Sequence, residues 1–156
     1  MARPPSSALR AVALRLLTRR EYTTFELRTK LTARQEYADD EIEQTLASLA
    51  SQGFLDDRRA AAAHVRSASR IKSRGRLRIQ RELEIRGLDR ELIRRALDDL
   101  PAADEAAALE RILQRRGLPN RLPAADRRRL FQQLLRRGFT ADLIAKALRQ
   151  RQEGED

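Results

Sequence analysis

The part of the sequence best suited to chemistry with a partner is a run of basic residues that no acidic residue interrupts. Nine basic residues and no Asp or Glu lie between Asp57 and Glu82. Arginine and lysine at this density are typical of surfaces that contact phosphate or an acidic protein groove. We therefore expect partner contacts here and on the helix that follows. The predicted contact residues are Arg66, Arg70, Lys72, Arg74, Arg76, Arg78, Arg81, Arg94 and Arg95.

An alternative interpretation of this basic run stays open, because a solvated helix face followed by a loop gives the same pattern. Arg58 and Arg59 open the run beside local acids and are weaker candidates than the residues after them. The run holds no aromatic residue, so we do not expect a platform for stacking bases. Direct DNA contact, if made, is expected to be to phosphate and independent of sequence. A second cluster, Arg127–Arg129 with Arg136 and Arg137, follows Asp126 and is less purely basic.

Residues that catalyse reactions or bind metals form no recognisable constellation. The chain has no cysteine, which excludes disulfides, thiolate metal sites and cysteine nucleophiles. His64 is the single histidine, and no carboxylates stand near it at the spacing of metal ligands. Phosphate-loop and dinucleotide-binding glycine motifs are absent. We expect no enzymatic activity, no cofactor and no metal.

The composition bounds the class of protein. The chain has 156 residues, a formal charge of +10 and a pI near 11.2. That charge indicates an acidic partner, but only three of the 33 basic residues are lysines, and a GC-rich coding sequence produces the same arginine bias. No window approaches the roughly 18 apolar residues of a membrane span, and no apolar signal core opens the chain. We expect a cytoplasmic monomer that does not contact membranes.

The elements that position these residues are predicted to be helices, arranged as a repeat. Strand-like alternation is absent, and the stretch 85–97 recurs as 136–148. The two align without gaps, Gly87 with Gly138 and Ile93 with Ile144, and a third, weaker copy includes Tyr37. Self-similarity at a period near 50 residues is typical of tandem repeats.

The predicted fold is therefore all-α, with about nine helices in three tandem three-helix repeats. We place the repeats at 8–52, 55–100 and 103–151, between flexible termini at 1–7 and 152–156. A single repeat of this size has a thin core, so neighbouring repeats should pack in series. We expect an elongated array, straight or curved.

Glycines and capping residues mark the corners within each repeat. Gly138 is expected to end one helix with a left-handed backbone, and Thr140 to cap the next. Asp89 takes the capping position in the middle repeat. In the first repeat, Thr23-x-x-Glu26 forms a capping box.

The junction Gly53-Phe-Leu-Asp-Asp57 is expected to be architectural. Gly53 ends a helix, and Phe54 and Leu55 are predicted to bury in the seam between repeats. Either Asp56 or Asp57 then caps the following helix.

Three segments, in this order and spacing, resemble the RecX regulatory proteins, which modulate the RecA recombinase. The segment 13–31 is similar to the opening of that family, with a leucine pair, an arginine, a Ser/Thr cap, Glu-Leu and Lys-Leu. Gly53-Phe-Leu-Asp-Asp57 is similar to its junction between the first two repeats, and Arg137-Gly-Phe-Thr-x-x-x-Ile144 to its C-terminal part. The resemblance covers nearly the whole chain. The family usually has phenylalanine where this chain has Ala60, which implies closer helix approach.

The resemblance implies a non-enzymatic regulator that acts in DNA repair, homologous recombination and the SOS response. RecX-like proteins bind the RecA filament on single-stranded DNA along its groove. They inhibit ATP hydrolysis, strand exchange and co-protease activity by blocking filament growth or favouring disassembly. The alternative from another class is a tandem helix-turn-helix transcriptional regulator. The third helices of the repeats share no pattern of base-reading side chains, which speaks against it.

Overall fold

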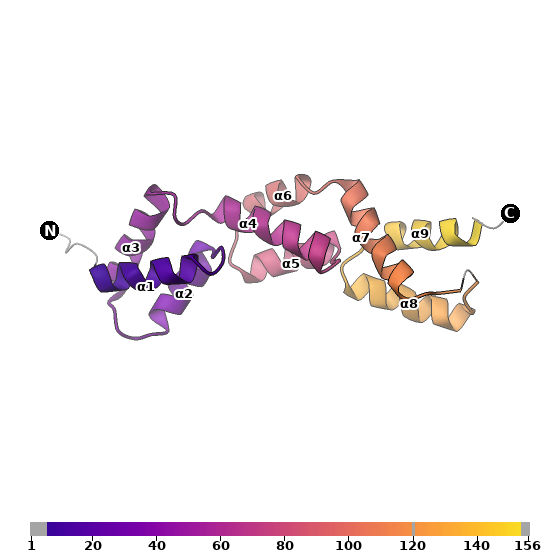
Figure 1. Ribbon diagram of the computed structural model, residues 1–156, viewed down its shortest axis with the longest axis horizontal. Coiled ribbons are helices and arrows are strands. Elements are labelled where there is room, and N and C mark those ends of the chain that lie inside the picture. Colours follow the sequence, from indigo (N-terminus) through magenta and orange to yellow (C-terminus); the bar gives the residue numbers. More distant parts are fainter. Residues whose placement is uncertain (1–5, 120, 154–156) are drawn as a thin grey trace. The chain divides into compact units, whose positions relative to one another are not determined.

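The structure is a computed structural model that describes residues 6–119 and 121–153, and this part of the chain is helical throughout (Figure 1). Nine α-helices, one π-helical turn and no strand occur within those ranges, which confirms the predicted all-α class. The helices are α1 (Ser7–Leu17), α2 (Thr24–Thr32), α3 (Asp39–Ser51), α4 (Asp57–Arg66), α5 (Arg76–Ile85), α6 (Arg90–Asp98), α7 (Ala102–Arg115), α8 (Ala124–Arg136) and α9 (Ala141–Glu153), with the π-helical turn η1 (Ser67–Ile71) after α4. None of the described helices is long and apolar enough to cross a membrane.

Contacts between residues divide the chain into two compact units. The first comprises Met1–Ala63 and Leu83–Ile93, and the second His64–Glu82 and Arg94–Asp156. The middle predicted repeat, 55–100, thus contributes residues to both units, and the three repeat boundaries stay a prediction. Of the termini predicted to be flexible, 1–5 and 154–156 lie outside the described residues, whereas Ser7 begins α1 and Gln152 lies in α9.

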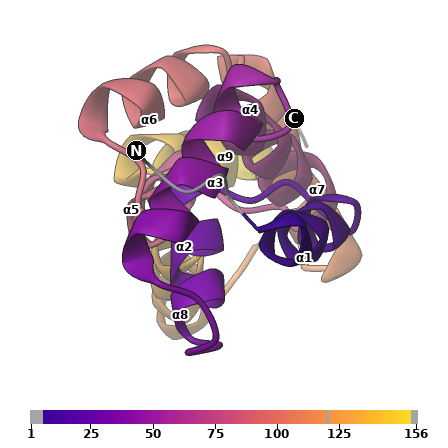
Figure 2. The ribbon, with the colours of Figure 1, turned by 90° about the vertical axis from the view of Figure 1, so that its left-hand side faces the viewer.

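The core of the first unit follows the expected helical spacing. Leu9 of α1 and Leu27 and Leu31 of α2 are fully buried, and Ile42 and Leu46 of α3 are nearly so. Helix α2 lies against α3, and α1 also contacts α3 (Figure 2). Side chains three or four residues apart share a helix face, so each helix offers one apolar stripe to this core.

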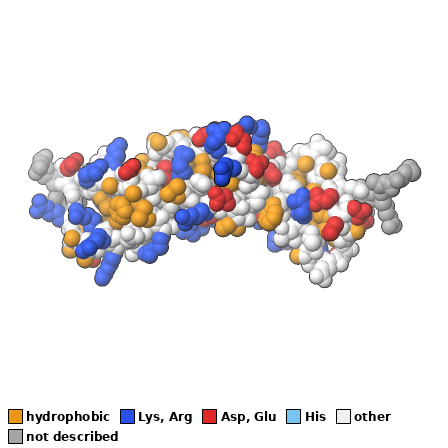
Figure 3. Space-filling model, turned by 180° about the vertical axis from the view of Figure 1, so that it is seen from behind, with side chains coloured by type: hydrophobic (Ala, Val, Ile, Leu, Met, Phe, Trp, Pro, Cys, Tyr) orange, Lys and Arg blue, Asp and Glu red, His pale blue; other side chains and the backbone are white. Residues whose placement is uncertain are grey.

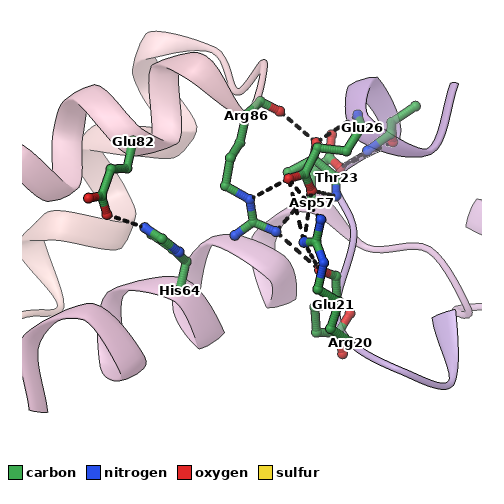
Figure 4. Close-up of polar contacts among 9 residues, drawn as sticks. Arg20, Glu21, Thr23, Glu26, Asp57, His64, Glu82 and Arg86 are labelled. Carbon is green, nitrogen blue, oxygen red and sulfur yellow. Dashed lines mark hydrogen bonds and ion pairs between the residues drawn. The ribbon is translucent and has the colours of Figure 1, made fainter. Parts of the chain in front are cut away.

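The predicted capping box at the start of α2 is confirmed, and it belongs to a larger polar network (Figure 4). Thr23 Oγ1 accepts a hydrogen bond from the Glu26 N–H at 3.1 Å, and Glu26 Oε2 accepts one from the Thr23 N–H at 2.9 Å. Arg86 donates to both carboxylate oxygens of Glu26, at 3.0 and 2.9 Å, and Thr23 Oγ1 donates to the Arg86 carbonyl at 2.6 Å. The segment around Arg86 is thereby fixed to the start of α2.

Arg86 changes the acidity of Glu26. Partial burial alone would raise the pKa of this carboxyl, but the hydrogen bond from Arg86, that from the Thr23 N–H and the charge of Arg86 together lower the pKa to about 2. The carboxylate therefore stays ionised at any pH near neutrality.

The junction at 53–57 is confirmed in part. Gly53 has a φ of 78° after the end of α3, and Leu55 is buried at 3 % exposure. The prediction that Phe54 is buried was wrong, because its exposed fraction is 48 %. Consecutive side chains of this non-helical segment point in different directions, so Leu55 faces the core and Phe54 faces out. The ring of Phe54 instead lies 5.8 Å from the guanidinium of Arg10.

The two aspartates of the junction have different roles. Asp56 Oδ1 accepts a hydrogen bond from the Arg59 N–H at 3.1 Å, so Asp56 is the residue that caps α4. Asp57 Oδ1 accepts from the N–H of Thr24 at 2.7 Å and from its hydroxyl at 3.1 Å, at the first residue of α2. Asp57 therefore does not cap α4, the helix it begins, but accepts hydrogen bonds from the first residue of α2.

The second unit is organised around α7, α8 and α9. Leu113, Leu134, Phe139 and Ile144 are fully buried in its core. Thr140 Oγ1 accepts a hydrogen bond from the Leu143 N–H at 3.3 Å, which confirms the predicted cap of α9. The corner between α8 and α9 therefore has the glycine and the cap that the repeat predicted, and the ring of Phe139 is buried between them.

The first turn of α5 receives its hydrogen-bond partners from this corner and from α7. The Gly75 N–H donates to the Arg137 carbonyl at 2.8 Å, and the Leu77 N–H donates to the Gly138 carbonyl at 3.0 Å. The Arg76 N–H donates to Glu105 Oε1 at 2.9 Å. Helix starts leave N–H groups without partners inside the helix, and here two backbone carbonyls and one carboxylate distant in sequence satisfy them. The backbone at Gly75 lies so close to the corner at Gly138 that a Cβ on Gly75 would overlap the Gly138 carbonyl carbon.

A π-helical turn separates α4 from α5. Helix α4 is α-helical to Arg66 and continues as η1, closed by a hydrogen bond of 3.2 Å from the Lys72 N–H to the Ser67 carbonyl. Residues 72–75 follow η1, and α5 begins at Arg76. The wider π-helical turn thus ends the helical segment that began at Asp57.

Candidate partner-binding surface

The predicted contact residues all belong to the second compact unit. They lie at the end of α4, in η1, in the turn that follows, on α5 and on α6. Arg66, Arg70, Lys72, Arg78, Arg81, Arg94 and Arg95 are exposed, and Arg74 and Arg76 are half-buried. The run is uninterrupted by acids in sequence, but the fold brings carboxylates to four of the predicted contact residues within it, and Arg59 at its start pairs with Glu21.

Glu82 supplies the first of these carboxylates, and three basic side chains contact it. Its Oε1 accepts from Arg74 at 2.6 Å and from Arg78 at 3.1 Å, and its Oε2 lies 2.8 Å from His64 Nε2 (Figure 4). Burial would raise the pKa of Glu82, but hydrogen bonds from His64, Arg74 and Arg78 outweigh it and lower the pKa below its usual value. Glu82 therefore offsets much of the positive charge of this end of the run.

Helix α7 supplies two more carboxylates. Glu105, which is almost fully buried, lies 3.7 Å from the guanidinium of Arg76 and accepts from the Arg76 N–H. Arg76 also donates to the Leu100 carbonyl at 3.2 Å. Asp104 pairs with Arg70 at 3.5 Å. The position of Arg76 indicates a structural role, because its charge is directed into the unit.

Three of the predicted contact residues in the run have no carboxylate partner among the described residues: Arg66, Lys72 and Arg81. All three are exposed, so their charge is fully available to a partner. On α6, Arg94 pairs with Asp98 at 2.8 Å, and Arg95 is exposed. The geometry thus sets Arg66, Lys72 and Arg81 apart from the other predicted contact residues of the run, which pair with carboxylates within the unit.

The contacts of His64 indicate a structural role. It contacts Glu82, and no group of three or more His, Cys, Asp or Glu side chains that could hold a metal occurs in the part of the chain that the structure describes. The side chains of His64 and Glu82 are 16 % and 19 % exposed, and their contact connects α4 to α5. The histidine therefore helps to position the basic run.

The role of Glu82 could have been found in the sequence, whereas those of Asp104 and Glu105 could not. Arg78 and Glu82 are four residues apart on one helix, a spacing that brings opposite charges together. The pairs with α7 depend on tertiary packing, which no local pattern encodes. A run without acids in sequence is therefore weak evidence of a free basic surface, because carboxylates of other helices can pair with it.

The second basic cluster lies on α8 and at its end. Arg127, Arg128, Arg129 and Arg136 are exposed, and Arg137 is half-buried. Asp126 reaches only Arg129, at 3.9 Å, which is a weak interaction for two exposed groups. The sequence favoured the run at 58–81 over this cluster. In the structure, however, the arginines of this cluster have fewer carboxylate partners than those at 70–78.

Fold and surface together define a class: an all-α, helical-repeat protein with exposed basic surfaces. Two family models match the chain, "RecX, first three-helix domain" over residues 10–49 and "RecX, second three-helix domain" over residues 56–97. The chain belongs to the RecX family.

Curated relatives support this assignment over most of the chain. The Regulatory protein RecX of Halorhodospira halophila is 40 % identical over 148 residues, which cover 91 % of this chain and 87 % of the relative. That of Thermobifida fusca is 36 % identical over 148 residues, covering 94 % and 80 %. These relatives are named regulatory proteins, which agrees with the expected class and does not favour the transcription-factor alternative.

Solved structures share the fold. The crystal structure of RecX from Lactobacillus salivarius superposes with a TM-score of 0.77 at 21 % identity and covers 94 % of this chain and 96 % of its own. A second, described as a crystal structure of regulatory protein RecX, has a TM-score of 0.72 at 20 % identity, covering 91 % and 72 %. At these identities the likeness establishes the fold alone.

Proposed function

We propose that this protein is a non-enzymatic regulator of the RecA filament on single-stranded DNA. It binds the filament and inhibits ATP hydrolysis, strand exchange and co-protease activity, by blocking filament growth or promoting disassembly. The observation that carries the proposal is membership of the RecX family over nearly the whole chain, with relatives named regulatory proteins.

The exposed residues Arg66, Lys72 and Arg81 are the proposed contacts of the basic run. They have no carboxylate partner among the described residues, so binding a phosphate or an acidic groove breaks no ion pair inside the protein. Arg74 and Arg76 are less suitable, because contact with a partner would require them to leave Glu82 and Glu105. We therefore assign these two to support of the surface and expect contact to be sequence-independent where it involves DNA.

The proposal is tested by titrating the protein into RecA from the same organism on single-stranded DNA. ATP hydrolysis and strand exchange should both fall at or below stoichiometric ratios. Absence of inhibition would contradict the proposed function. Gel filtration of the free protein tests the expectation that it acts as a monomer.

The contact residues are tested by a triple variant, Arg66→Gln with Lys72→Gln and Arg81→Gln. Each exposed pair contributes up to ~1 kcal/mol, so binding to the filament should weaken about tenfold or more. The matched control is Arg15→Gln with Arg19→Gln and Lys30→Gln, which removes the same charge from exposed residues of the first unit outside the run. Equal losses in the two triple variants would mean that overall charge, and not this surface, determines binding.

A salt titration of the same variants separates DNA from protein contact. Each phosphate contact to a single strand adds about 0.7 to the slope of log affinity against log salt. If all three residues contact phosphate, the triple variant should lose about 2 from that slope.

A further inference from the structure

A groove between α8 and α9 combines an apolar floor with a basic rim. Its volume is about 240 Å³, and its floor is formed by Phe131, Ala145 and Leu148. Arg127 and Arg128 of α8 and Arg149 of α9 line its edges, together with Gln152. Figure 3 shows apolar side chains gathered on this face of the second unit with Lys and Arg side chains around them.

The apolar floor packs against the core of the unit but is not fully buried in it. Leu134 and Ile144 fill that core and are fully buried, whereas Phe131, Ala145 and Leu148 are half-buried and keep one side open. Half-exposed apolar side chains at the base of a hollow gain free energy when another apolar group covers them. The groove is therefore suited to receive a large apolar side chain.

The rim selects for negative charge. No carboxylate lines the groove, and Arg127, Arg128 and Arg149 have no ion-pair partner among the described residues. A neighbouring hollow of about 400 Å³ shares Arg128 and adds Arg129 and Arg136 with two glutamines, so the basic rim continues along α8. A partner that lies across both hollows meets arginines along its length.

We propose that the α8–α9 groove docks an acidic amphipathic helix of a partner protein. One large apolar side chain of that helix occupies the space above Phe131 and Leu148, and carboxylates on either side of it bind Arg127, Arg128 and Arg149. Helices commonly bind in this way, with apolar anchors in a groove and charges around them. The inference rests on this groove alone and does not depend on the proposed function.

Two other occupants fit the groove less well. A nucleic acid base needs polar groups for its edges, and Gln152 is the single uncharged polar side chain of the lining. A second copy of this chain, with a formal charge of +10, would bring arginine rims face to face. An acidic helix satisfies both the apolar floor and the basic rim.

The test uses the full chain and a labelled synthetic 18-residue helical peptide. The peptide carries Leu and Phe four residues apart, with Glu at the flanking positions, and binding is followed by fluorescence anisotropy. A second peptide replaces Leu and Phe by Ser and keeps every charge. Oligothymidine of similar charge is the nucleic acid probe. The first peptide should bind at least about tenfold more tightly than the second, as expected for burial of one large apolar side chain in the groove.

Variants of the protein locate the binding site. Ala145→Glu places a carboxylate on the groove floor without disturbing helix propensity and should abolish peptide binding. Arg128→Gln with Arg149→Gln should weaken it about threefold to tenfold, as two exposed ion pairs would. Arg15→Gln with Arg19→Gln is the matched control and should leave it unchanged. Circular dichroism of each variant confirms that the helices are retained.

Three results would overturn the proposal. Equal affinity for the two peptides would show that charge alone is recognised. An unchanged affinity with Ala145→Glu would place binding elsewhere. Tighter binding of oligothymidine that is lost in the same groove variants would identify a nucleic acid site in place of a helix-docking site.

Discussion

Replacing Gly138 by alanine is expected to destabilise the protein more than a glycine-to-alanine change at any open turn. Gly138 has a φ of 92°, a conformation that side chains disfavour, and an added Cβ would overlap the backbone nitrogen of Arg78. The overlap occurs where α5 begins, next to the hydrogen bond from the Leu77 N–H to the Gly138 carbonyl. The backbone must therefore move apart at a contact that caps a helix.

The magnitude has two parts. A left-handed backbone costs a residue with a side chain roughly 1–2 kcal/mol relative to glycine. Displacing the start of α5 weakens the bonds from the Gly75 and Leu77 N–H groups, each contributing about 0.5–1.5 kcal/mol. The total is about 3 kcal/mol of unfolding free energy. For a chain of this length this corresponds to a melting temperature lower by about 6–12 °C.

The matched control is Gly117→Ala, in the same compact unit. Gly117 also has a positive φ, 54°, but an added Cβ would meet nothing within 4 Å. We expect this variant to lose about 1 kcal/mol, from the backbone conformation alone. Urea unfolding followed by circular dichroism compares the two. If both variants lose the same free energy, the close approach of α5 to the corner at Gly138 contributes nothing, and the reasoning is refuted.

Two predictions concern carboxylates. Because the pKa of Glu26 is lowered to about 2 in the folded protein, its contribution is present above its unfolded pKa, near 4.5, and is lost as the pH falls toward 2. Glu26→Gln should cost on the order of 2 kcal/mol at pH 7 and almost nothing at pH 2; a cost independent of pH, measured by urea unfolding at both values, would contradict this. Glu82→Gln should cost about 1 kcal/mol, because Arg74 and Arg78 lose their partner, and should strengthen binding to the RecA filament severalfold, because both become available. A loss of both stability and binding would show that the pairing positions this surface for its partner.

Local features of the fold were predictable from the sequence because short-range physics decides them. The capping box at Thr23, the caps at Asp89 and Thr140 and the glycine corner at Gly138 each depend on residues within one turn of helix. The burial of Leu134 and Ile144 follows from helical spacing. Such features report where helices begin, where they end and which face they bury.

Features that depend on contacts distant in sequence were not predictable. The pairing of Arg76 with Glu105 and of Arg70 with Asp104 requires α7 to pack beside the basic run, and nothing in the run encodes that. The exposure of Phe54 depends on which of two adjacent apolar residues reaches the core. The α8–α9 groove was also missed, because helical spacing alone does not show that Phe131 and Leu148 keep one side open.

The start of α5 depends on residues far along the chain. The N–H groups of Gly75, Arg76 and Leu77 bind oxygen atoms of Arg137, Glu105 and Gly138, so α5 is completed by α7 and by the corner that follows α8. The helices up to α6 are therefore not independent of those that follow. Shortening the protein after α6 would remove more than its final three helices, since α5 would fray at its start and the residues it carries, Arg81 among them, would lose their fixed positions.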